Sequence, residues 1–346
     1  MSRTDVQKLK ISILIPCHNE ELGIRQCIQS CLNQTRKPDQ ILVVNDGSTD
    51  GSAAVLKEFG DAIEGVTLPR ATGNKSFAQE KGLKFITGDA FIATDGDTLL
   101  DERFVELIEK DLEDPEVAAV SGYVVSRKYN WLTACRELDY VIGQDLHKVA
   151  QSNINFLFVI PGCAGVFRTK LFKKFINFDH DTLTEDLDFT YRLHKQCLTI
   201  KYNRQARAYT QDPVTLGAYI NQMRRWYAGG WQNLIKHFGV VNRPTNALEL
   251  SLMYIEGLIF SAALFIFPII NLNFFKFFIA PYFLFMLIIG TYAAFARKRP
   301  DLIIYAPFYV LLVFVNSYIF LEQFVKEIIF RNSNRVWFKP ERVAYD

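Results

Sequence analysis

The sequence has little excess charge of either sign. Its 346 residues include 39 Lys and Arg against 37 Asp and Glu, which gives a formal net charge of +2. Proteins that hold nucleic acids mainly through phosphate contacts carry a clear basic excess, so we expect no nucleic-acid partner. Hydrophobic residues make up 49% of the chain and charged residues only 22%, a balance that excludes an intrinsically disordered protein.

The cysteines form no Cys-x-x-Cys pair, because they stand at positions 17, 27, 31, 135, 163 and 197. This spacing indicates neither a zinc site, nor a redox motif, nor a disulfide framework, and it fits a reducing, cytosolic environment. The first ten residues contain no apolar stretch of the kind that signal peptides carry. We therefore expect no cleaved signal peptide.

Long uncharged runs are confined to the last third of the chain, at residues 257–275, 277–296 and 302–321. A helix that spans a bilayer needs about 20 mostly apolar residues. We therefore expect a soluble domain over residues 1–245, ending in an interfacial amphipathic helix at about 213–238. A membrane domain over residues 246–346 should follow, with two or three transmembrane helices (about 250–272, 275–296 and 302–322) and a basic C-terminal tail.

The positive-inside rule gives these helices an orientation, with one ambiguity. The first link between them carries Lys276, and the second carries Arg297-Lys298-Arg299. This places the first link outside the cell, and the second link and the large domain inside. Three full spans would then put the basic tail outside, with its Lys326, Arg331, Arg335, Lys339 and Arg342. Either the rule fails here, or residues 302–330 lie along the interface or re-enter.

The first part of the chain alternates buried strands with helical patterns. Uninterrupted apolar runs, which are typical of buried parallel strands, occur at residues 11–15, 41–44 and 90–93. Helical patterns occur at residues 22–32, 52–59 and 76–86. This rhythm predicts an α/β, Rossmann-like fold: a parallel sheet with helices on both faces, which binds ligands at the carboxyl ends of its strands.

Polar or acidic residues follow each of these three strands. They read Pro16-Cys-His18-Asn-Glu20, then Asn45-Asp46-Gly-Ser-Thr-Asp50, then Thr94-Asp95-Gly-Asp97. Each segment alone is common in a turn. Two acidic segments at the same edge of a sheet repel each other, however, unless a cation lies between them. A divalent metal, Mg²⁺ or Mn²⁺, shared with a nucleotide diphosphate would supply that cation.

Two later motifs, Thr184-Glu185-Asp186 and Gln222-Met-Arg-Arg225-Trp226, complete a pattern. Together with the strand ends they resemble the family 2 glycosyltransferases, with a glycosyltransferase-A type fold. More narrowly, the chain is similar over about residues 8–240 to the membrane-bound processive synthases of poly-N-acetylglucosamine, hyaluronan, chitin and cellulose. The resemblance implies an inverting transfer of a sugar, N-acetylglucosamine being the first choice, from a UDP-sugar to a growing polysaccharide. It also implies a multi-pass protein of the cell membrane with its catalytic domain in the cytosol.

The resemblance also implies roles for individual residues. The catalytic set comprises the base Asp186 with Glu185 beside it, Arg225 facing the diphosphate, Trp226 stacking on the acceptor sugar, and Gln222 of the same motif. Asp188 is the next candidate for the base. The metal ligands would be Asp97 and Asp95. The nucleotide-sugar would be bound by Pro16, His18, Glu20, Asp46, Lys75 and Asp95. The acceptor would be bound by Gly162, Cys163 and Trp226.

The sequence departs from this family in one respect, since polymer synthases usually carry helices before the catalytic domain and none is predicted here. Two or three helices cannot by themselves enclose a channel for a sugar chain. We therefore expect a homo-oligomer, or a partner subunit that completes the pore, or a product that this chain does not extrude; membrane lipid is a further expected partner. Two alternatives stay open: a non-processive transferase that acts on a lipid-linked acceptor, and an inactive membrane scaffold. The intact motif set argues against the scaffold.

Overall fold

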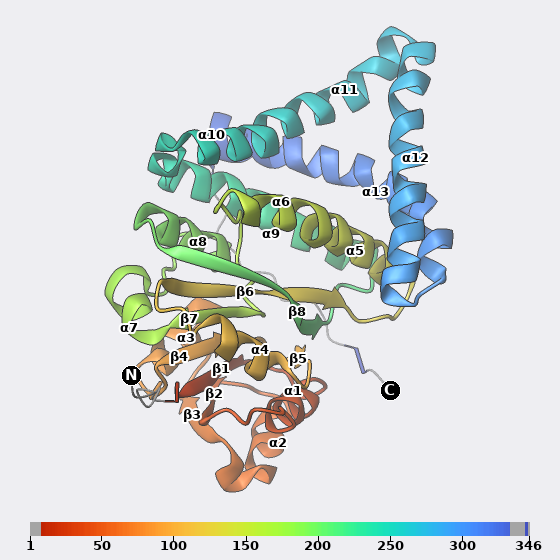
Figure 1. The fold of residues 1–346 in the computed structure, drawn as a ribbon. Coiled ribbons are helices and arrows are strands. Elements are labelled where there is room, and N and C mark those ends of the chain that lie inside the picture. Colours follow the sequence, from red (N-terminus) through yellow and green to blue (C-terminus); the bar gives the residue numbers. More distant parts are fainter. Residues whose placement is uncertain (1–7, 333–342, 345–346) are drawn as a thin grey trace, which may run out of the picture.

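The computed structural model describes residues 8–332 and 343–344. Its α/β part is built on a sheet whose strands lie in the order β3-β2-β1-β4-β7-β6-β8-β5 (Figure 1). The strands are β1 (Ile11–Cys17), β2 (Gln40–Asp46), β3 (Glu64–Leu68), β4 (Ala90–Ala93), β5 (Leu99–Leu100), β6 (Val117–Ser126), β7 (Gly165–Arg168) and β8 (Thr199–Thr210). The predicted strands at residues 11–15, 41–44 and 90–93 are the cores of β1, β2 and β4.

Helices connect and cover these strands. The helices of the α/β part are α1 (Ile24–Leu32), α2 (Ser52–Glu58), α3 (Lys75–Leu83), α4 (Phe104–Asp111), α5 (Trp131–Val141), α6 (Lys148–Asn153), α7 (Thr169–Leu171), α8 (Glu185–Lys195) and α9 (Leu216–Lys236). The apolar helices that follow are α10 (Pro244–Ser251), α11 (Gly257–Ile270), α12 (Leu272–Arg297) and α13 (Asp301–Phe324). Short 3₁₀ or π turns are η1 (Gly60–Ala62), η2 (Ile142–His147), η3 (Phe172–Ile176), η4 (Phe238–Asn242), η5 (Leu252–Glu256) and η6 (Val325–Ile329).

The expectation of a wholly parallel sheet was wrong. Strands β3, β2, β1 and β4 are parallel, but β7 runs antiparallel to both β4 and β6, and β5 runs antiparallel to β8. The physical reason is the connection between β6 and β7. Helices α5 and α6 cover the sheet on the way to β7, and β7 then enters between β4 and β6 in the opposite direction. The fold class itself, a Rossmann-like glycosyltransferase-A type, is confirmed.

The strands β1, β2, β4 and β6 are buried on both faces, as continuous apolar strands require. Successive side chains of a strand point to opposite faces. Ile13 and Ile15 of β1 pack with α1 and α4 in one cluster, whereas Leu14 packs with α3 and α8 in another. This sandwiching fixes the carboxyl ends of β1, β2 and β4 at one edge of the sheet.

Helices α5 and α9 join the α/β part to the apolar helices (Figure 1). Leu138 of α5 and Met223 of α9 share one hydrophobic core with Leu264 of α11, Met286 of α12 and Val313 of α13. The predicted amphipathic helix at about 213–238 corresponds to α9. Its apolar side therefore packs on other helices of the same chain, among them α5, α8 and α13.

Three helical segments are long and apolar enough to cross a membrane: Pro244–Ile270, Leu272–Arg297 and Asp301–Ile329. They differ in how far they are buried against the rest of the chain. The shares of buried residues in their most apolar windows are 17%, 11% and 44%, respectively. Segments Pro244–Ile270 and Leu272–Arg297 project away from the sheet, whereas α13 lies over α9 (Figure 1). Of the predicted basic tail, Lys326 and Arg331 are described, and Arg335, Lys339 and Arg342 lie outside the described residues.

Candidate active site

The loops after β1 and β2 are tied to each other at the carboxyl edge of the sheet. His18 Nδ1 donates to the carbonyl oxygen of Asp46 at 2.7 Å, and the backbone N–H of Asn19 donates to Ser48 Oγ at 3.0 Å. Gly47 has a φ of +58°, and a Cβ there would lie 2.3 Å from the backbone nitrogen of Ala71. Only glycine fits that close approach, so the Asp46-Gly47 step fixes how the two loops meet.

Asp46 holds the loop that leads into α3. Its carboxylate accepts hydrogen bonds from the backbone N–H of Thr72 at 2.9 Å and from Thr72 Oγ1 at 2.8 Å. Asp46 is only 4% exposed. Each carboxylate oxygen has a further lone pair, so Asp46 can accept a donor from a ligand while it positions this loop.

The turn after β4 carries Asp95 and Asp97 and is braced by the first loop. A Cβ at Gly96 would lie 3.0 Å from Glu20 Cγ and 3.4 Å from the carbonyl oxygen of Pro16. Asp97 is 3% exposed and accepts a hydrogen bond from Thr98 Oγ1 at 3.1 Å. Pro16 and Glu20 therefore support the acidic turn directly.

This acidic turn fits a metal shared with a diphosphate. Two carboxylates from one tight turn are hard oxygen ligands, and Mg²⁺ is commonly held by one or two carboxylates together with substrate phosphates. Across the described residues, no group of three or more His, Cys, Asp or Glu side chains is placed to hold a metal. A metal bound at Asp95 and Asp97 would therefore need its remaining ligands from the nucleotide and from water.

Lys75, at the start of α3, connects two acidic segments that are far apart in the sequence. Its ammonium forms an ion pair with Asp95 and a second one with Glu185 Oε1 at 3.3 Å. Burial disfavours the charged form of Lys75, but the neighbouring Asp95 and Glu185 outweigh burial and raise the pKa of Lys75. The lysine is therefore a permanent cation between the donor loops and α8.

Asp186, in the first turn of α8, has the properties of a general base. Burial and the neighbouring Glu185 raise the pKa of Asp186 to about 6, against the opposing effects of Lys75 and Arg225. One of its carboxylate oxygens accepts a hydrogen bond from the backbone N–H of Leu187 at 2.9 Å. A carboxylate with this pKa is ionised at neutral pH and is basic enough to take a proton from a hydroxyl in a transition state.

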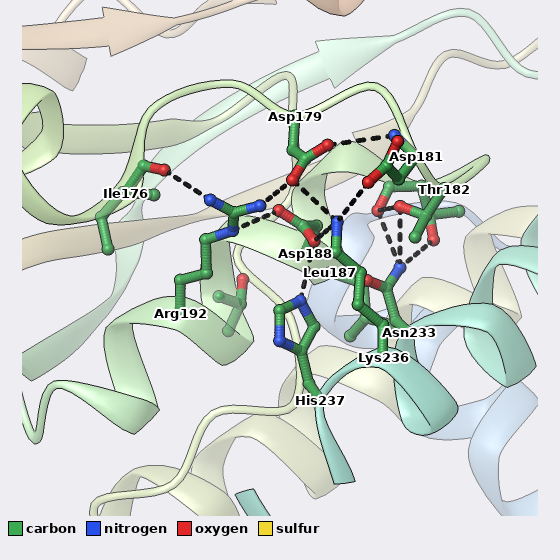
Figure 2. Close-up of polar contacts among 12 residues, drawn as sticks. Ile176, Asp179, Asp181, Thr182, Leu187, Asp188, Arg192, Asn233, Lys236 and His237 are labelled. Carbon is green, nitrogen blue, oxygen red and sulfur yellow. Dashed lines mark hydrogen bonds and ion pairs between the residues drawn. The ribbon is translucent and has the colours of Figure 1, made fainter. Parts of the chain in front are cut away.

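Asp188, the second candidate for the base, is engaged elsewhere (Figure 2). It is 1% exposed, and its carboxylate contacts Arg192 Nε at 2.8 Å, Lys236 Nζ at 2.8 Å and His237 Nε2 at 2.7 Å. Burial disfavours its charged form, but these hydrogen bonds and charges outweigh burial and lower the pKa of Asp188. Such a carboxylate is a poor proton acceptor, which makes Asp186 the better candidate for the base.

The segment before β7 lies against this cluster. A Cβ at Gly162 would lie 3.2 Å from Lys75 Nζ, 3.6 Å from Glu185 Oε1 and 3.7 Å from Asp186 Cβ. The neighbouring Cys163 is 8% exposed. Burial, and then the charge of Asp95, raise the pKa of its thiol, so Cys163 is a neutral wall residue.

The residues of the Gln222–Trp226 motif lie along α9. Arg225 Nη1 donates to the carbonyl oxygen of Leu183 at 3.4 Å, which places the guanidinium at the turn that leads to Glu185 and Asp186. Gln222 is 8% exposed. The Trp226 ring has the Arg136 guanidinium over it, with Cζ 4.7 Å from the ring centroid. Trp226 is therefore part of a packed arrangement with α5.

Sequence reasoning missed two buried basic residues near this site. Arg136 of α5 pairs with Asp139 at 2.5 Å and lies near Asp212 at 3.5 Å. Lys148 of α6 donates to Ser121 Oγ at 3.1 Å, and burial lowers the pKa of Lys148 to about 8 despite the nearby Cys163 and Asp186. Neither residue belongs to a motif. The one available signal is a cation within an otherwise apolar helical pattern, as in Leu132-Thr-Ala-Cys-Arg136.

The structure thus brings most of the predicted residues together. Close contacts link Lys75, Asp95, Gly162, Glu185 and Asp186. Cys163 and Arg225 are near enough for charges to act between them and this group, and Pro16, Glu20 and Asp97 adjoin it through Gly96. His18 and Asp46 lie in the neighbouring pair of loops, and Gln222 and Trp226 lie on α9.

Comparisons with known proteins show what the chain is similar to. The family described as Glycosyl transferase family 2 matches residues 12–174. A curated poly-beta-1,6-N-acetyl-D-glucosamine synthase from Staphylococcus epidermidis is 28% identical over 232 residues, or 66% of this chain and 56% of the relative. The enzyme of the same name from Staphylococcus aureus (strain COL) is 29% identical over 233 residues, with the same two shares. The matched region thus spans little more than half the length of these relatives.

Two solved structures have a similar fold. A mannosyltransferase from Pyrobaculum calidifontis, in complex with GDP-mannose and Mn²⁺, matches with a TM-score of 0.61 and 18% identity over 90% of this chain and 88% of that one. S. aureus TarS 1-349 in complex with UDP matches with a TM-score of 0.50 and 14% identity over 92% of each chain.

Proposed function

Since residues 12–174 form a glycosyl transferase family 2 domain, we propose that the chain transfers a sugar from a UDP-sugar to a hydroxyl of a growing polysaccharide at a membrane, with inversion. N-acetylglucosamine is the proposed sugar, because the curated relatives are named poly-beta-1,6-N-acetyl-D-glucosamine synthases. The observation that carries the proposal is Lys75, which contacts both the acidic turn after β4 and Glu185, next to the candidate base.

The donor half of the reaction belongs to the loops at the edge of the sheet. Pro16, His18, Glu20 and Asp46 would line the uridine, and Lys75 would contact the diphosphate. Asp95 and Asp97 would hold Mg²⁺ or Mn²⁺. When bound, the metal supplies positive charge that stabilises the leaving diphosphate.

The acceptor half belongs to α8 and α9. Asp186 would take the proton of the acceptor hydroxyl as that oxygen attacks the anomeric carbon of the sugar. Arg225 would face the negative charge that develops on the leaving diphosphate and would stabilise the transition state. Trp226, with Gly162 and Cys163, would bind the acceptor sugar.

For the membrane part, we propose that Pro244–Ile270 and Leu272–Arg297 cross as a hairpin and that α13 lies along the interface. Polar contacts join α13 to α5 and α9: Tyr309 donates to Asp139, Tyr219 to Asn316 Oδ1 at 2.8 Å, and Arg224 to Glu322 Oε2 at 2.9 Å. In η6, which follows α13, Glu327 Oε1 accepts a hydrogen bond from Gln232 Nε2 of α9 at 3.2 Å. The span from residue 309 to residue 327 covers about 27 Å of helix, nearly the thickness of a hydrocarbon core.

If α13 crossed the bilayer, the charged residues of α5 and α9 beside it would have to enter the hydrocarbon, which is costly. An interfacial α13 places Lys326 and Arg331 on the same side as the catalytic domain, which satisfies the positive-inside rule. The proposed location is therefore a cell membrane with the catalytic domain and both ends of α13 on the cytosolic side.

Cysteine labelling tests this topology. In a Cys197→Ser background, which removes the exposed native thiol, Arg331→Cys should react with a membrane-impermeant maleimide in inverted vesicles. Asn271→Cys, in the link between α11 and α12, is the matched control and should react only in right-side-out vesicles. Equal labelling of Arg331→Cys and Asn271→Cys from the same side would contradict the interfacial placement.

A non-processive transfer to a lipid-linked acceptor is the second candidate. It is favoured by the outward apolar faces of α11 and α12, where Ile269 is 85% exposed and Phe277 is 78% exposed. Such faces suit lipid or a second subunit better than the lining of a sugar channel. A polymer synthase built on this chain would therefore need a second copy or a partner to enclose its product.

One assay separates these functions. Detergent-solubilised protein is incubated with radiolabelled UDP-N-acetylglucosamine, UDP-glucose or UDP-glucuronate, with Mg²⁺ or Mn²⁺ present, and the product is sized. We expect a long polymer from UDP-N-acetylglucosamine. Single-sugar products on extracted lipid would support the second candidate. No transfer from any of the three donors would refute the proposed function and favour an inactive scaffold.

A further inference from the structure

The turn that leads into α8 is held from outside by α9. Its central residue, Leu183, donates its backbone N–H to Gln232 Oε1 at 3.0 Å and accepts from Arg225 Nη1 at 3.4 Å. The same Gln232 donates through Nε2 to Glu327 Oε1 at 3.2 Å. The two residues after this turn are Glu185 and the candidate base Asp186.

Asn233, one residue further along α9, holds both sides of this turn (Figure 2). It is 0% exposed, and its Nδ2 lies 3.2 Å from Thr182 Oγ1, 3.1 Å from the carbonyl oxygen of Thr184 and 3.0 Å from Thr184 Oγ1. A carbonyl oxygen can only accept, so the nitrogen of the amide must face the turn. The side-chain amide of Asn233 thus holds residues 182–184 in place by donating hydrogen bonds to them.

Helix α9 and the turn meet without a gap at Gly229. A Cβ at this position would lie 2.3 Å from Thr184 Oγ1 and 2.6 Å from Thr184 Cγ2. Real Cβ atoms do not approach so closely, and the glycine therefore allows Thr184 to rest on the helix backbone. With Asn233 one helical turn further on, Thr184 is fixed on one side by shape and on the other by hydrogen bonds.

We infer that Asn233 is a positioning residue, which fixes the turn 182–184 on α9 so that Asp186 keeps its place relative to Arg225 and the acceptor. This inference rests on the proposed function of Asp186. Asn233 itself contacts the turn and α9, so it acts through Thr184 and not on a reacting atom. Displacements of about 1 Å from reactive geometry can cost on the order of 10²-fold in rate.

A second set of contacts keeps α8 and α9 together independently of Asn233. Asp188 contacts Lys236 and His237 at the end of α9, and Lys236 also pairs with Asp179 Oδ2 at 2.8 Å (Figure 2). These ion pairs remain when Asn233 is shortened. The substitution Asn233→Ala should therefore loosen the turn without separating the two helices, and the variant should fold.

The matched control is Asn246→Ala. Asn246 is another buried asparagine, 4% exposed, whose Nδ2 donates to the carbonyl oxygen of Val240 at 3.1 Å. It lies on α10, outside the turn before α8. For full-length protein we expect Asn233→Ala to lower kcat on the order of 10²-fold. The KM for the donor and the Kd for UDP should stay within about two-fold, and Asn246→Ala should leave kcat within about two-fold.

A conservative pair at Thr184 makes the test independent of cavity formation. Thr184→Ser keeps the hydroxyl that accepts from Asn233, and Thr184→Val keeps the shape but removes it. We expect Thr184→Ser to retain kcat within about two-fold and Thr184→Val to lose about five-fold, since one hydrogen bond of about 1 kcal/mol is removed.

Hydrogen exchange read by mass spectrometry supplies a measurement that needs no turnover. Residues 182–190 should exchange faster in Asn233→Ala than in Asn246→Ala or the unsubstituted chain. If the unsubstituted chain transfers sugar but Asn233→Ala and Asn246→Ala have equal kcat, the positioning role is overturned while the proposed function stands. If the unsubstituted chain transfers nothing, the proposed function fails. Unchanged exchange at residues 182–190 in Asn233→Ala would show that Asn233 does not hold the turn 182–184 in place.

Discussion

The donor and acceptor sides of the candidate site are held in different ways. The donor side lies within the first hundred residues, and its loops are tied by short connections such as His18 to the carbonyl of Asp46 and Asp46 to Thr72. The acceptor side depends on side chains of α9, which is itself held by α13 and η6 through Glu322 and Glu327. The donor loops are therefore tied mainly to one another, with Lys75 as a link to α8, whereas the position of the candidate base depends on the apolar helices.

This contrast makes a general prediction about variants. Changes on the donor side should alter the binding of the nucleotide. Changes on the acceptor side should alter kcat and leave nucleotide binding in place. The measurements below either sharpen this separation or break it, and they run from the largest expected effect to the smallest.

Removal of the metal should have the largest effect. Asp95 and Asp97 follow a buried strand and are the proposed ligands of the metal that stabilises the leaving diphosphate, so EDTA should abolish transfer and added Mg²⁺ or Mn²⁺ should restore it. Asp97→Ala should stay nearly inactive even at high metal, and its affinity for UDP with metal should fall. Full transfer in EDTA would remove the metal from the proposal.

Substitution of the base should come next. Asp186→Asn keeps the shape of the side chain and removes its basicity, so kcat should fall by roughly 10²–10⁴-fold. Calorimetry should show UDP binding near that of the unsubstituted protein. Asp188→Asn is the control, and it should lower Tm because a buried carboxylate that contacts Arg192, Lys236 and His237 is lost, while kcat stays within about three-fold. A larger kcat loss in Asp188→Asn than in Asp186→Asn would reverse the assignment.

Trp226 tests whether stacking or packing matters on α9. Trp226→Ala removes an aromatic platform, and transfer should fall about ten-fold, in line with about 1–1.5 kcal/mol for an aromatic contact. Trp226→Phe should recover part of the rate. Trp231→Phe, on the same helix but packed against Phe320 and Phe324, should change stability more than rate. If Trp226→Ala synthesises product at a near-normal rate, and flotation shows that it is still attached to the membrane, then Trp226 does not bind the acceptor sugar.

The pH profile reports the ionisation of Asp186. The base acts only when ionised, and its pKa is raised to about 6. The rate should therefore be flat above about pH 7 and fall as pH drops through 6, to about a quarter of the plateau at pH 5.5. The acid limb should vanish in Asp186→Asn. A rate that is independent of pH between 5 and 7.5 would contradict an acid limb set by Asp186.

The smallest effect is expected on the donor side, at Thr72. Thr72→Val removes the hydroxyl that donates to Asp46 but keeps the backbone hydrogen bond. The affinity for UDP should fall about three-fold, the lower end of the range for one hydrogen bond, and kcat at saturating donor should not change. A fall in kcat without a change in UDP affinity would break the separation of the two sides.

The same contrast explains what could be predicted from the sequence. The buried strands β1, β2 and β4 have a local signal, and the acidic and polar residues at their ends follow from strand geometry. The antiparallel β7 has no such signal, because its direction depends on how α5 and α6 cross the sheet. The packing of α13 against α9 could not be predicted from the sequence either, since the apolar pattern of residues 302–321 fits contact with a bilayer as well as contact with another helix.

The side chains of the site also fall into those that the sequence could predict and those that it could not. Asp186 and Arg225 stand in recognisable motifs, and the structure brings them together through the turn at Leu183. Asn233, Lys148 and Arg136 stand in no motif, and their importance comes from partners distant in the chain, such as Thr184 for Asn233 and Ser121 for Lys148. Burial of a polar group is informative only when its partner is known.

The lysine that contacts Asp95 and Glu185 has a consequence for the order of binding. With Lys75 paired to Asp95, a metal ion alone must compete with a built-in cation for the same carboxylate. In the proposed site, a nucleotide diphosphate would offer Lys75 a new anionic partner and so would free Asp95 for the metal. Metal and nucleotide should therefore bind with positive cooperativity: each should raise the affinity of the other by the same factor, as linkage requires. Replacing Lys75 with Met should strengthen the binding of metal alone and reduce that coupling.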